Sequence, residues 1–353
     1  MPVYRLDRGR RKSEYRAVPT LSQNGLVGIA RMAAESPRIE AKSRVDYFDL
    51  AARTFLAKVG PNARVPFRWM INPYRGCEFG CKYCYARYAH EFMELRDPMD
   101  FERRIFVKQF DANAFQRELR RLPQGESIAI GTATDPYQPT ERRYGITRSI
   151  LQAFAQTSGF RLGITTKSQL VARDIDVLQE VARRHFLTIS MTVTTADTAL
   201  ARAIEPMAPR PDLRLSAVRK LVKGGVRATV FCAPILPLLT DSDASIDAVA
   251  KAAKAAGAKG FGGNVVFLKP CAYQVFLPFL EEKFPLLVRR YRERFERSAY
   301  LRGDYPERIA ERIARIRQRY GFEKRFHEQE EPELWPHDSQ LTLFSDPAFS
   351  DSA

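Results

Sequence analysis

The sequence lacks long apolar runs, and no stretch approaches the roughly 18 consecutive apolar residues of a membrane-spanning helix. The basic N-terminus, MPVYRLDRGRRKSEYR, also lacks the apolar segment that a signal peptide needs. Cysteine is scarce, with five in 353 residues and three of these clustered, which excludes a disulfide framework in a chain of this size. We therefore expect a cytoplasmic protein in a reducing compartment, with no membrane partner.

Acidic residues are outnumbered by basic ones. Lys and Arg total 57, Asp and Glu total 41, and the net charge is +16. This excess favours a polyanionic partner such as nucleic acid, because basic side chains neutralise phosphates and release counterions. A solvated basic surface without such a partner explains the same balance equally well. Hydrophobic residues make up 45% of the chain, which is enough for the core of a barrel-sized domain.

The pattern along the chain predicts four regions. We expect a basic N-terminal segment at 1–60, a barrel-like domain at 61–275, C-terminal helices at 276–322 and a flexible tail at 323–353. In the second region, short β-rich runs alternate with amphipathic stretches, as in repeated βα units around a parallel sheet. About six units favour an α/β fold with a partial (β/α)6 TIM-type barrel over a doubly wound sheet, a choice that rests partly on the resemblance described below.

The expected elements follow from short apolar runs and helical spacing. Strands are expected near residues 67–72, 105–107, 127–134, 161–166, 186–193, 227–236 and 260–269. Helices are expected near residues 85–95, 111–122, 147–157, 171–184, 212–223 and 242–256. Asp111 is a candidate N-cap, and the helical spacing of Ile309, Ile313 and Ile316 indicates a packing face.

The strongest motif is a cysteine cluster, in which Cys77, Cys81 and Cys84 have the spacing CxxxCxxC. Three such thiolates can bind three irons of a [4Fe-4S] cluster and leave the fourth iron open for a small molecule. One alternative is a structural zinc site with His90 as the fourth ligand, and another is three unrelated thiols. Zinc sites usually have paired ligand groups, whereas this single group follows a predicted strand in a large α/β chain, which favours the cluster.

The motif CEFGCKYC and its flanks, NPYRGC and CYAR, resemble the radical S-adenosylmethionine (SAM) enzymes, in the branch related to spore photoproduct lyase and DNA repair photolyase-like proteins. The resemblance covers about residues 65–270. It implies a partial barrel in which the open iron chelates the amino and carboxylate groups of SAM. It also implies cleavage of SAM to methionine and a 5′-deoxyadenosyl radical, with an electron from a donor such as flavodoxin or ferredoxin.

The resemblance further implies SAM contacts at predicted strand ends. In GTATDPYQPTE, Thr134 and Asp135 offer a hydroxyl and a carboxylate to the ammonium or ribose, although a local turn explains the same residues. Lys167 closes an apolar strand and would pair with the SAM carboxylate, although a solvated lysine fits equally well. Three further contacts are implied. Ser190 would offer a strand hydroxyl, Ala233 would be the small residue beside the adenine, and Tyr83 would stack near the adenine.

One position departs from the family pattern. Lyases of the spore photoproduct type carry a hydrogen-donating cysteine where this chain has Thr132. The thymine-dimer reaction is therefore not implied. Cys232, Cys271 and Tyr137 are candidate replacement donors or relays, although a lone cysteine in an apolar run is more often simply buried.

The polar tail contains a second motif. Gln340, Leu341, Leu343 and Phe344 form a QLxLF arrangement that resembles the peptide by which bacterial repair proteins dock on the sliding clamp. Such a peptide would fold on binding. The alternative is that these residues pack back on the parent domain.

Together these features predict a radical SAM enzyme with a [4Fe-4S] cluster and SAM, which acts on damaged or modified DNA in the manner of spore photoproduct lyase. One alternative keeps the radical chemistry and changes the substrate to RNA, protein or a small molecule. Another is a zinc-stabilised, non-catalytic nucleic-acid adaptor that the tail recruits to the clamp.

Overall fold

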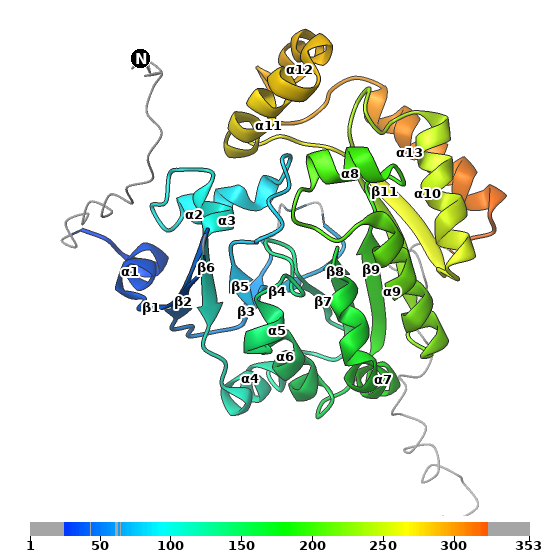
Figure 1. The fold of residues 1–353 in the computed structure, drawn as a ribbon. Coiled ribbons are helices and arrows are strands. Elements are labelled where there is room, and N and C mark those ends of the chain that lie inside the picture. Colours follow the sequence, from blue (N-terminus) through cyan, green and yellow to red (C-terminus); the bar gives the residue numbers. More distant parts are fainter. Residues whose placement is uncertain (1–24, 43, 61–62, 64, 324–353) are drawn as a thin grey trace, which may run out of the picture.

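The computed structural model describes residues 25–42, 44–60, 63 and 65–323. Its centre is a seven-stranded sheet in which six parallel strands follow the order of the chain (Figure 1). This arrangement confirms the predicted α/β fold with a partial (β/α)6 TIM-type barrel. From one edge to the other, the strands are β11 (Gly260–Val265), β10 (Ala228–Ile235), β9 (Phe186–Thr192), β8 (Arg161–Thr166), β7 (Ser127–Ile130), β4 (Trp69–Ile71) and the antiparallel β3 (Leu56–Lys58).

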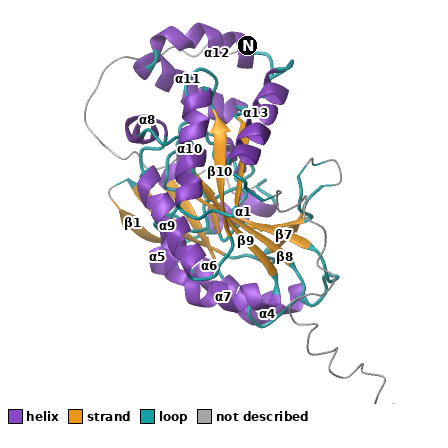
Figure 2. Cartoon of the chain, turned by 90° about the vertical axis from the view of Figure 1, so that its right-hand side faces the viewer, coloured by secondary structure: helices purple, strands orange, loops and turns teal. Residues whose placement is uncertain are grey.

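Helices connect these strands, and Figure 2 shows α6, α7 and α9 on one side of the sheet. Five of them match predicted helices: α4 (Ala112–Leu119), α6 (Ile146–Phe154), α7 (Ile175–Arg184), α9 (Pro211–Lys223) and α10 (Asp243–Ala255). The helix expected near residues 85–95 is present as η1 (Tyr85–Arg87) followed by α2 (Tyr88–Glu91). The other connecting elements are short, namely α3 (Asp100–Arg103), α5 (Glu141–Tyr144), η2 (Gln169–Asp174) and α8 (Thr198–Ile204).

Local sequence explains several helix starts. The carboxylate of Asp111 accepts hydrogen bonds from the backbone N of Asn113 at 2.9 Å and of Ala114 at 3.0 Å, so the predicted N-cap of α4 is confirmed. Ser242 caps α10 through the backbone N of Ser245 at 3.1 Å. Capping of this kind satisfies donors that the first helical turn leaves free.

A second, four-stranded sheet lies beside the first. Its order is β1 (Arg38–Lys42), β2 (Val45–Leu50), β6 (Arg104–Lys108) and β5 (Tyr74–Arg75), and α1 (Gly28–Glu35) precedes it. The strand β2 pairs in parallel with β6, which follows it by more than 50 residues. The segment expected to be a basic peripheral region therefore contains α1, β1, β2 and β3, which the sequence analysis did not foresee.

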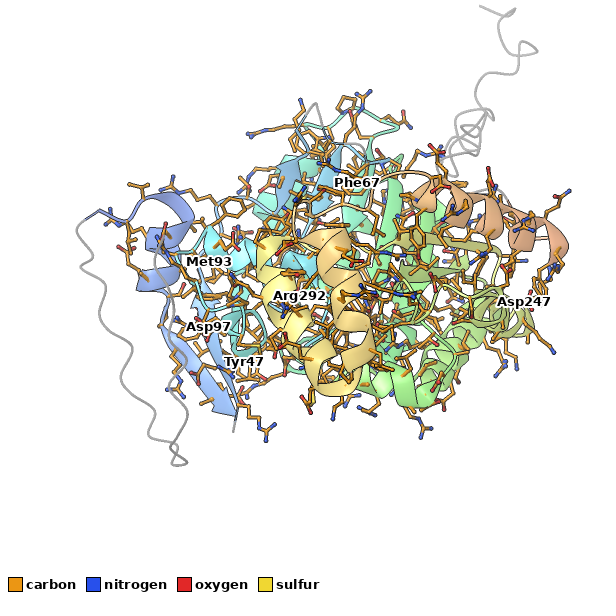
Figure 3. All side chains as sticks on the ribbon, turned by 90° about the horizontal axis from the view of Figure 1, so that it is seen from above. Tyr47, Phe67, Met93, Asp97, Asp247 and Arg292 are labelled. Atoms are coloured by element: carbon orange, nitrogen blue, oxygen red, sulfur yellow. The ribbon has the colours of Figure 1, made fainter. Side chains whose placement is uncertain are left out.

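The C-terminal helices are α11 (Pro270–Lys283), η3 (Pro285–Leu287), α12 (Val288–Phe295) and α13 (Tyr305–Arg319). Ile309, Ile313 and Ile316 of α13 are buried in the main core, so the predicted packing face is confirmed. Phe276 of α11 and Tyr291 of α12 belong instead to a second core cluster that includes the cysteine loop. Figure 3 looks down on this end of the molecule and shows α11 and α12 across it, with Arg292 labelled.

No helix among the described residues is long and apolar enough to cross a membrane. The predicted clamp peptide, with Gln340, Leu341, Leu343 and Phe344, lies outside the described residues.

Candidate active site

The cysteine loop follows β4 and β5, at the end of the sheet to which the parallel strands run. Cys77 and Cys81 are buried, Cys84 is half-buried, and none of them forms a disulfide. Gly76 begins the loop with a φ of +85°, and a Cβ there would lie 2.8 Å from the carbonyl oxygens of Phe101 and Arg104. Only glycine fits such a position without displacing the backbone around it.

The loop that follows β7 holds the cysteine loop in place. The carbonyl of Gly76 accepts hydrogen bonds from Thr134 Oγ1 at 2.6 Å and from Gln138 Nε2 at 3.1 Å. The oxygen of the same Gln138 amide accepts from the backbone N of Glu78 at 2.9 Å. Thr134, a predicted SAM contact, thus uses its hydroxyl within the protein, and Gln138 is a positioning residue that sequence reasoning missed.

The smaller sheet also reaches this loop. Tyr47 of β2 donates from its hydroxyl to Glu78 Oε2 at 2.9 Å, and Thr140 donates to the other oxygen of the same carboxylate. The buried ring of Tyr47 lies in β2, so the N-terminal segment helps to fix the cysteine loop.

Asp135 joins the ends of β7 and β8. Its carboxylate accepts from Thr166 Oγ1 at 2.6 Å, from the backbone N of Lys167 at 2.7 Å and from the backbone N of Tyr137 at 2.9 Å. Burial raises the pKa of Asp135 above its usual value, although these hydrogen bonds act in the opposite direction. The local turn that the sequence suggested is therefore present, together with bonds to the next strand.

The ammonium of Lys167 points toward the cysteine loop. Its Nζ lies 5.8 Å from the ring centroid of Tyr83, and it interacts electrostatically with Cys81, Glu205 and Asp135. Burial lowers the pKa of Lys167, but the charges of Cys81 and Glu205 outweigh it, and the net pKa is raised. Lys167 therefore stays cationic beside the cysteines.

Tyr83, Glu205 and Arg214 form a buried network behind the cysteines. The Tyr83 hydroxyl donates to Glu205 Oε1, and Arg214 forms an ion pair with Glu205 Oε2 at 2.5 Å. Burial raises the pKa of Glu205, but the cations Arg214 and Lys167 more than offset it, so the net pKa is lowered. This pair is not predictable from a local pattern, because Glu205 follows α8 and Arg214 lies within α9, with no shared motif.

Thr194 links the network to another predicted residue. Its hydroxyl lies 2.7 Å from Glu205 Oε1 and 3.0 Å from the carbonyl oxygen of Ala233. Tyr83 and Ala233, both predicted to be near the adenine of SAM, thus contact the same threonine. Ser190 lies earlier on β9, and its Oγ is 3.2 Å from Thr229 Oγ1 on β10.

Burial also acts on the cysteines themselves. It raises the pKa of Cys77 well above the usual value and that of Cys81 to about 12, although Lys167 lowers the pKa of Cys81. Burial thus disfavours the thiolate forms of Cys77 and Cys81, and binding of irons would require both thiols to lose their protons.

These residues fit a [4Fe-4S] cluster. The donors on the loop are thiols with no disulfide partner, its backbone is fixed by hydrogen bonds, and two of the sulfurs are shielded from water. No group of three or more His, Cys, Asp or Glu side chains among the described residues is arranged to hold a single metal ion. Cysteines that bind three different irons of a cube stand further apart than ligands of one ion.

The candidate donors have different surroundings. Cys232 is buried, with its Sγ 4.0 Å from the carbonyl oxygen of Thr194, and Cys271 lies in α11 beside Glu91. Burial raises the pKa of each thiol to about 12. Tyr137 is fully buried in the main core near Asp174, whereas Cys77 and Cys81 belong to the second core cluster.

Thr132, at the position where a donor cysteine would stand, lies at the end of β7. Its Oγ1 is 3.1 Å from Asn72 Nδ2, and its carbonyl accepts a hydrogen bond of 2.5 Å from the Tyr85 hydroxyl. The threonine is thus held close to the cysteine loop but offers no thiol.

A cavity of about 380 Å³ lies elsewhere, between η2 and α9, and its lining includes Arg142, Arg173 and Lys220. None of its lining residues belongs to the cysteine loop or to the predicted SAM contacts. The cavity therefore does not mark this site.

His90, the fourth ligand of the zinc alternative, has other partners. Its Nε2 lies 3.0 Å from the carbonyl oxygen of Arg104, and its ring packs edge-on against Phe101 and Phe106. Burial lowers the pKa of His90 to about 4, so the ring is neutral near pH 7 and donates its Nε2 proton to that carbonyl.

Replacing His90 with Gln is therefore expected to leave the iron content of the reconstituted protein unchanged. Iron and zinc would be measured by plasma mass spectrometry in the wild type, in His90→Gln and in Cys81→Ala, which should lose iron. Circular dichroism would show that each variant is folded. Loss of metal from a folded His90→Gln protein would contradict the assignment of His90 to the core.

Comparisons with known proteins give a consistent result. The family model of the Radical SAM superfamily matches residues 71–267. The chain is 34% identical over 305 residues to an uncharacterized protein of Mycobacterium tuberculosis, across 86% of this chain and 87% of that protein. It is 29% identical over 174 residues to an uncharacterized protein of Methanocaldococcus jannaschii, across 49% of this chain and 62% of that protein.

Among solved structures, the fold resembles spore photoproduct lyase complexed with dinucleoside spore photoproduct. The TM-score is 0.56 at 15% identity, with 87% of this chain and 85% of the lyase covered. A mutant of that lyase with bound AdoMet and dinucleoside spore photoproduct gives a TM-score of 0.54 at 14% identity, with 85% and 86% covered. At this level of identity, the likeness shows a shared fold.

Proposed function

Because the chain belongs to the radical SAM superfamily, we propose that Cys77, Cys81 and Cys84 bind its [4Fe-4S] cluster and that SAM binds beside them. The superfamily uses this cluster and SAM, and the chain is an enzyme of the radical SAM class. This membership contradicts the alternative of a non-catalytic zinc adaptor. The observation that carries the site assignment is the convergence of three unpaired cysteines with the half-buried Lys167 cation.

The cluster and SAM supply reductive cleavage of SAM to methionine and a 5′-deoxyadenosyl radical, with one electron from a donor such as flavodoxin or ferredoxin. The protein contributes position and shielding from water. Lys167 pairs with the carboxylate of SAM, and Asp135 fixes the backbone from which Lys167 projects. The second core cluster under α11 and α12 excludes water from Cys77 and Cys81.

The remaining contacts follow from the strand ends. Tyr83 and Ala233 border the adenine, since both contact Thr194 in the buried network. Thr134 faces the polar end of SAM through the loop it supports, and Ser190 offers a hydroxyl on β9.

We further propose that the substrate is damaged or modified DNA. The net charge of +16 supports a polyanionic partner, and the shared fold with spore photoproduct lyase supports the same class of substrate. Thr132 replaces the donor thiol of that type of lyase, so the proposal covers hydrogen abstraction from DNA and assigns no thiol donor.

The test is anaerobic reconstitution with iron and sulfide, followed by addition of SAM, a chemical reductant and oligonucleotides with and without defined lesions. Brown protein that releases 5′-deoxyadenosine, together with deuterium transfer between a labelled lesion and deoxyadenosine in mass spectra, would support both parts of the proposal. Colourless protein with one zinc per chain would overturn the cluster. Deoxyadenosine release without any change in DNA, but with RNA turnover, would overturn the DNA substrate.

A further inference from the structure

Aromatic rings form a continuous row beside the cysteine loop. Ring centroids are 5.8 Å apart for Phe92 and Tyr88, 6.4 Å for Tyr88 and Tyr85, 4.7 Å for Tyr85 and Phe267, and 5.4 Å for Phe267 and Tyr300. We call these five residues the aromatic row. Three of its pairs are stacked or tilted, which leaves ring faces roughly aligned along much of its length.

Both ends of the row are exposed to solvent. Phe92 is 62% exposed and Tyr300 is 59% exposed, and they are the only aromatic side chains classed as exposed among the described residues. Aromatic rings are usually buried or half-buried because exposure to water is unfavourable. Two exposed rings that belong to one row therefore indicate a binding surface for another molecule.

The fold brings the row together from distant parts of the chain. Tyr85 directly follows Cys84 and Tyr88 lies one helical turn further on, Phe267 follows β11, and a β-bridge pairs Phe267 with Tyr300. α11 contacts η1, so the C-terminal helices hold these segments side by side. Through the bond of the Tyr85 hydroxyl to Thr132, the middle of the row reaches the end of β7.

Two cations flank the row. Lys269 Nζ lies 3.5 Å from the centroid of Tyr88, and the guanidinium of Arg75 interacts electrostatically with the Tyr88 hydroxyl. Neither cation has a hydrogen bond or an ion pair with a described residue, and Arg75 Nε is buried without a partner. The carboxylate of Glu91, three residues after Tyr88, interacts with the Cys271 thiol. A surface of aromatic rings beside cations that have no acidic partner among the described residues suits a ligand with flat rings and negative charge.

We propose that the aromatic row binds unpaired bases of a DNA strand, with Lys269 and Arg75 at its phosphates. This inference rests on the proposed action on DNA and adds the form of the substrate and its binding surface. Bases in a duplex hide their faces in the stack, so a row of rings engages only a single strand or an extruded nucleotide. Because Tyr85 adjoins Cys84, a strand on the row passes next to the site of radical formation.

The test measures binding of the full-length protein to a fluorescent single-stranded oligonucleotide by anisotropy, with the duplex of the same sequence as comparison. Tyr300→Ala and Phe92→Ala should each weaken single-strand binding about fivefold or more, since stacking on one ring contributes this much. Lys269→Ala should weaken binding and reduce its salt dependence. The Tyr300→Trp variant should retain binding, because it keeps a ring face.

Matched controls are Leu286→Ala, which removes an apolar side chain that is 91% exposed and is not part of the row, and Lys251→Ala, which removes an exposed lysine of α10. Both should bind as the wild type does. A 2-aminopurine base in the oligonucleotide should lose fluorescence on binding to the wild type and less so with Tyr300→Ala.

The outcomes separate the two proposals. If the wild type binds single strands and the row variants bind equally well, the row is not the surface, whereas the proposed function stands. Tighter binding of the duplex than of the single strand also overturns the inference. If the wild type binds neither the single-stranded nor the duplex DNA, the proposal of a DNA substrate is wrong. The same holds if the wild type binds RNA of the same sequence more than about tenfold tighter than DNA.

Discussion

Single replacement of Cys77, Cys81 or Cys84 with Ala is expected to abolish cluster assembly and with it the release of 5′-deoxyadenosine. Each cysteine is the ligand of a different iron in the proposed cluster, so no other thiol on the loop can replace a missing one. The fold should survive, because the loop is also held by Thr134, Gln138 and the glycine at its start. The effect would be measured by the iron content, by the visible absorbance of the cluster and by assays of released 5′-deoxyadenosine.

The chain supplies matched controls in its other two cysteines. Cys232 and Cys271 are buried, and burial raises the pKa of both to about 12, as it does for Cys81. Their Ala variants should keep iron and SAM cleavage, which separates a ligand from a merely buried thiol. Full iron content in Cys77→Ala, or loss of iron in Cys232→Ala without unfolding, would contradict the assignment.

Arg214→Met is expected to lower the free energy of unfolding by about 3–5 kcal/mol, because it leaves the carboxylate of Glu205 buried without its main partner. Both side chains are almost fully buried, and the remaining groups around that carboxylate are the hydroxyls of Tyr83 and Thr194 and the more distant Lys167. The backbone N of Lys82 also bonds the carbonyl of Ile204 at 2.9 Å, so the damage should extend to the cysteine loop. Urea unfolding followed by circular dichroism would give the change.

The control is Arg210→Met, four residues earlier in the chain. Arg210 forms an ion pair with Asp212 at 2.8 Å, but both side chains are exposed, so its loss should hardly change stability. The double variant Glu205→Leu/Arg214→Met should be more stable than Arg214→Met alone, since it removes the unpaired charge as well. Equal stability of the Arg214→Met and Arg210→Met proteins would rule out the buried pair as a structural support.

Much of the fold was predictable because it depends on local patterns. The strand expected at residues 161–166 is β8 with the same bounds, and Asp111 caps α4 as expected. The smaller sheet was not predictable in this way. β1 is the five-residue segment RIEAK, whose two apolar residues are too few to identify a strand by themselves, and β2 is stabilised by pairing with the distant β6. Non-local pairing of this kind leaves little trace in a local window.

The predicted site shows the same division. Asp135 and Lys167 come together because each follows a parallel strand, and parallel strands end at the same edge of a sheet. The ring of Tyr83 lies 5.8 Å from Lys167 Nζ, and its hydroxyl contacts Thr194, which also bonds the carbonyl of Ala233. The sequence analysis missed three residues of the site, namely Glu205, Arg214 and Gln138. Charged and amide side chains are mostly exposed, so burial of a particular one is evident only from the packing around it.

The sequence by itself determined the class of cofactor chemistry, because the spacing of Cys77, Cys81 and Cys84 is a local property of one loop and does not depend on the arrangement of the rest. Only the tertiary structure decided what surrounds that loop. It buried Glu205 against Arg214, turned Lys167 toward the cysteines and aligned Tyr85 with Phe267 and Tyr300. These contacts join residues far apart in the chain, and burial and packing, which no local spacing encodes, bring them together.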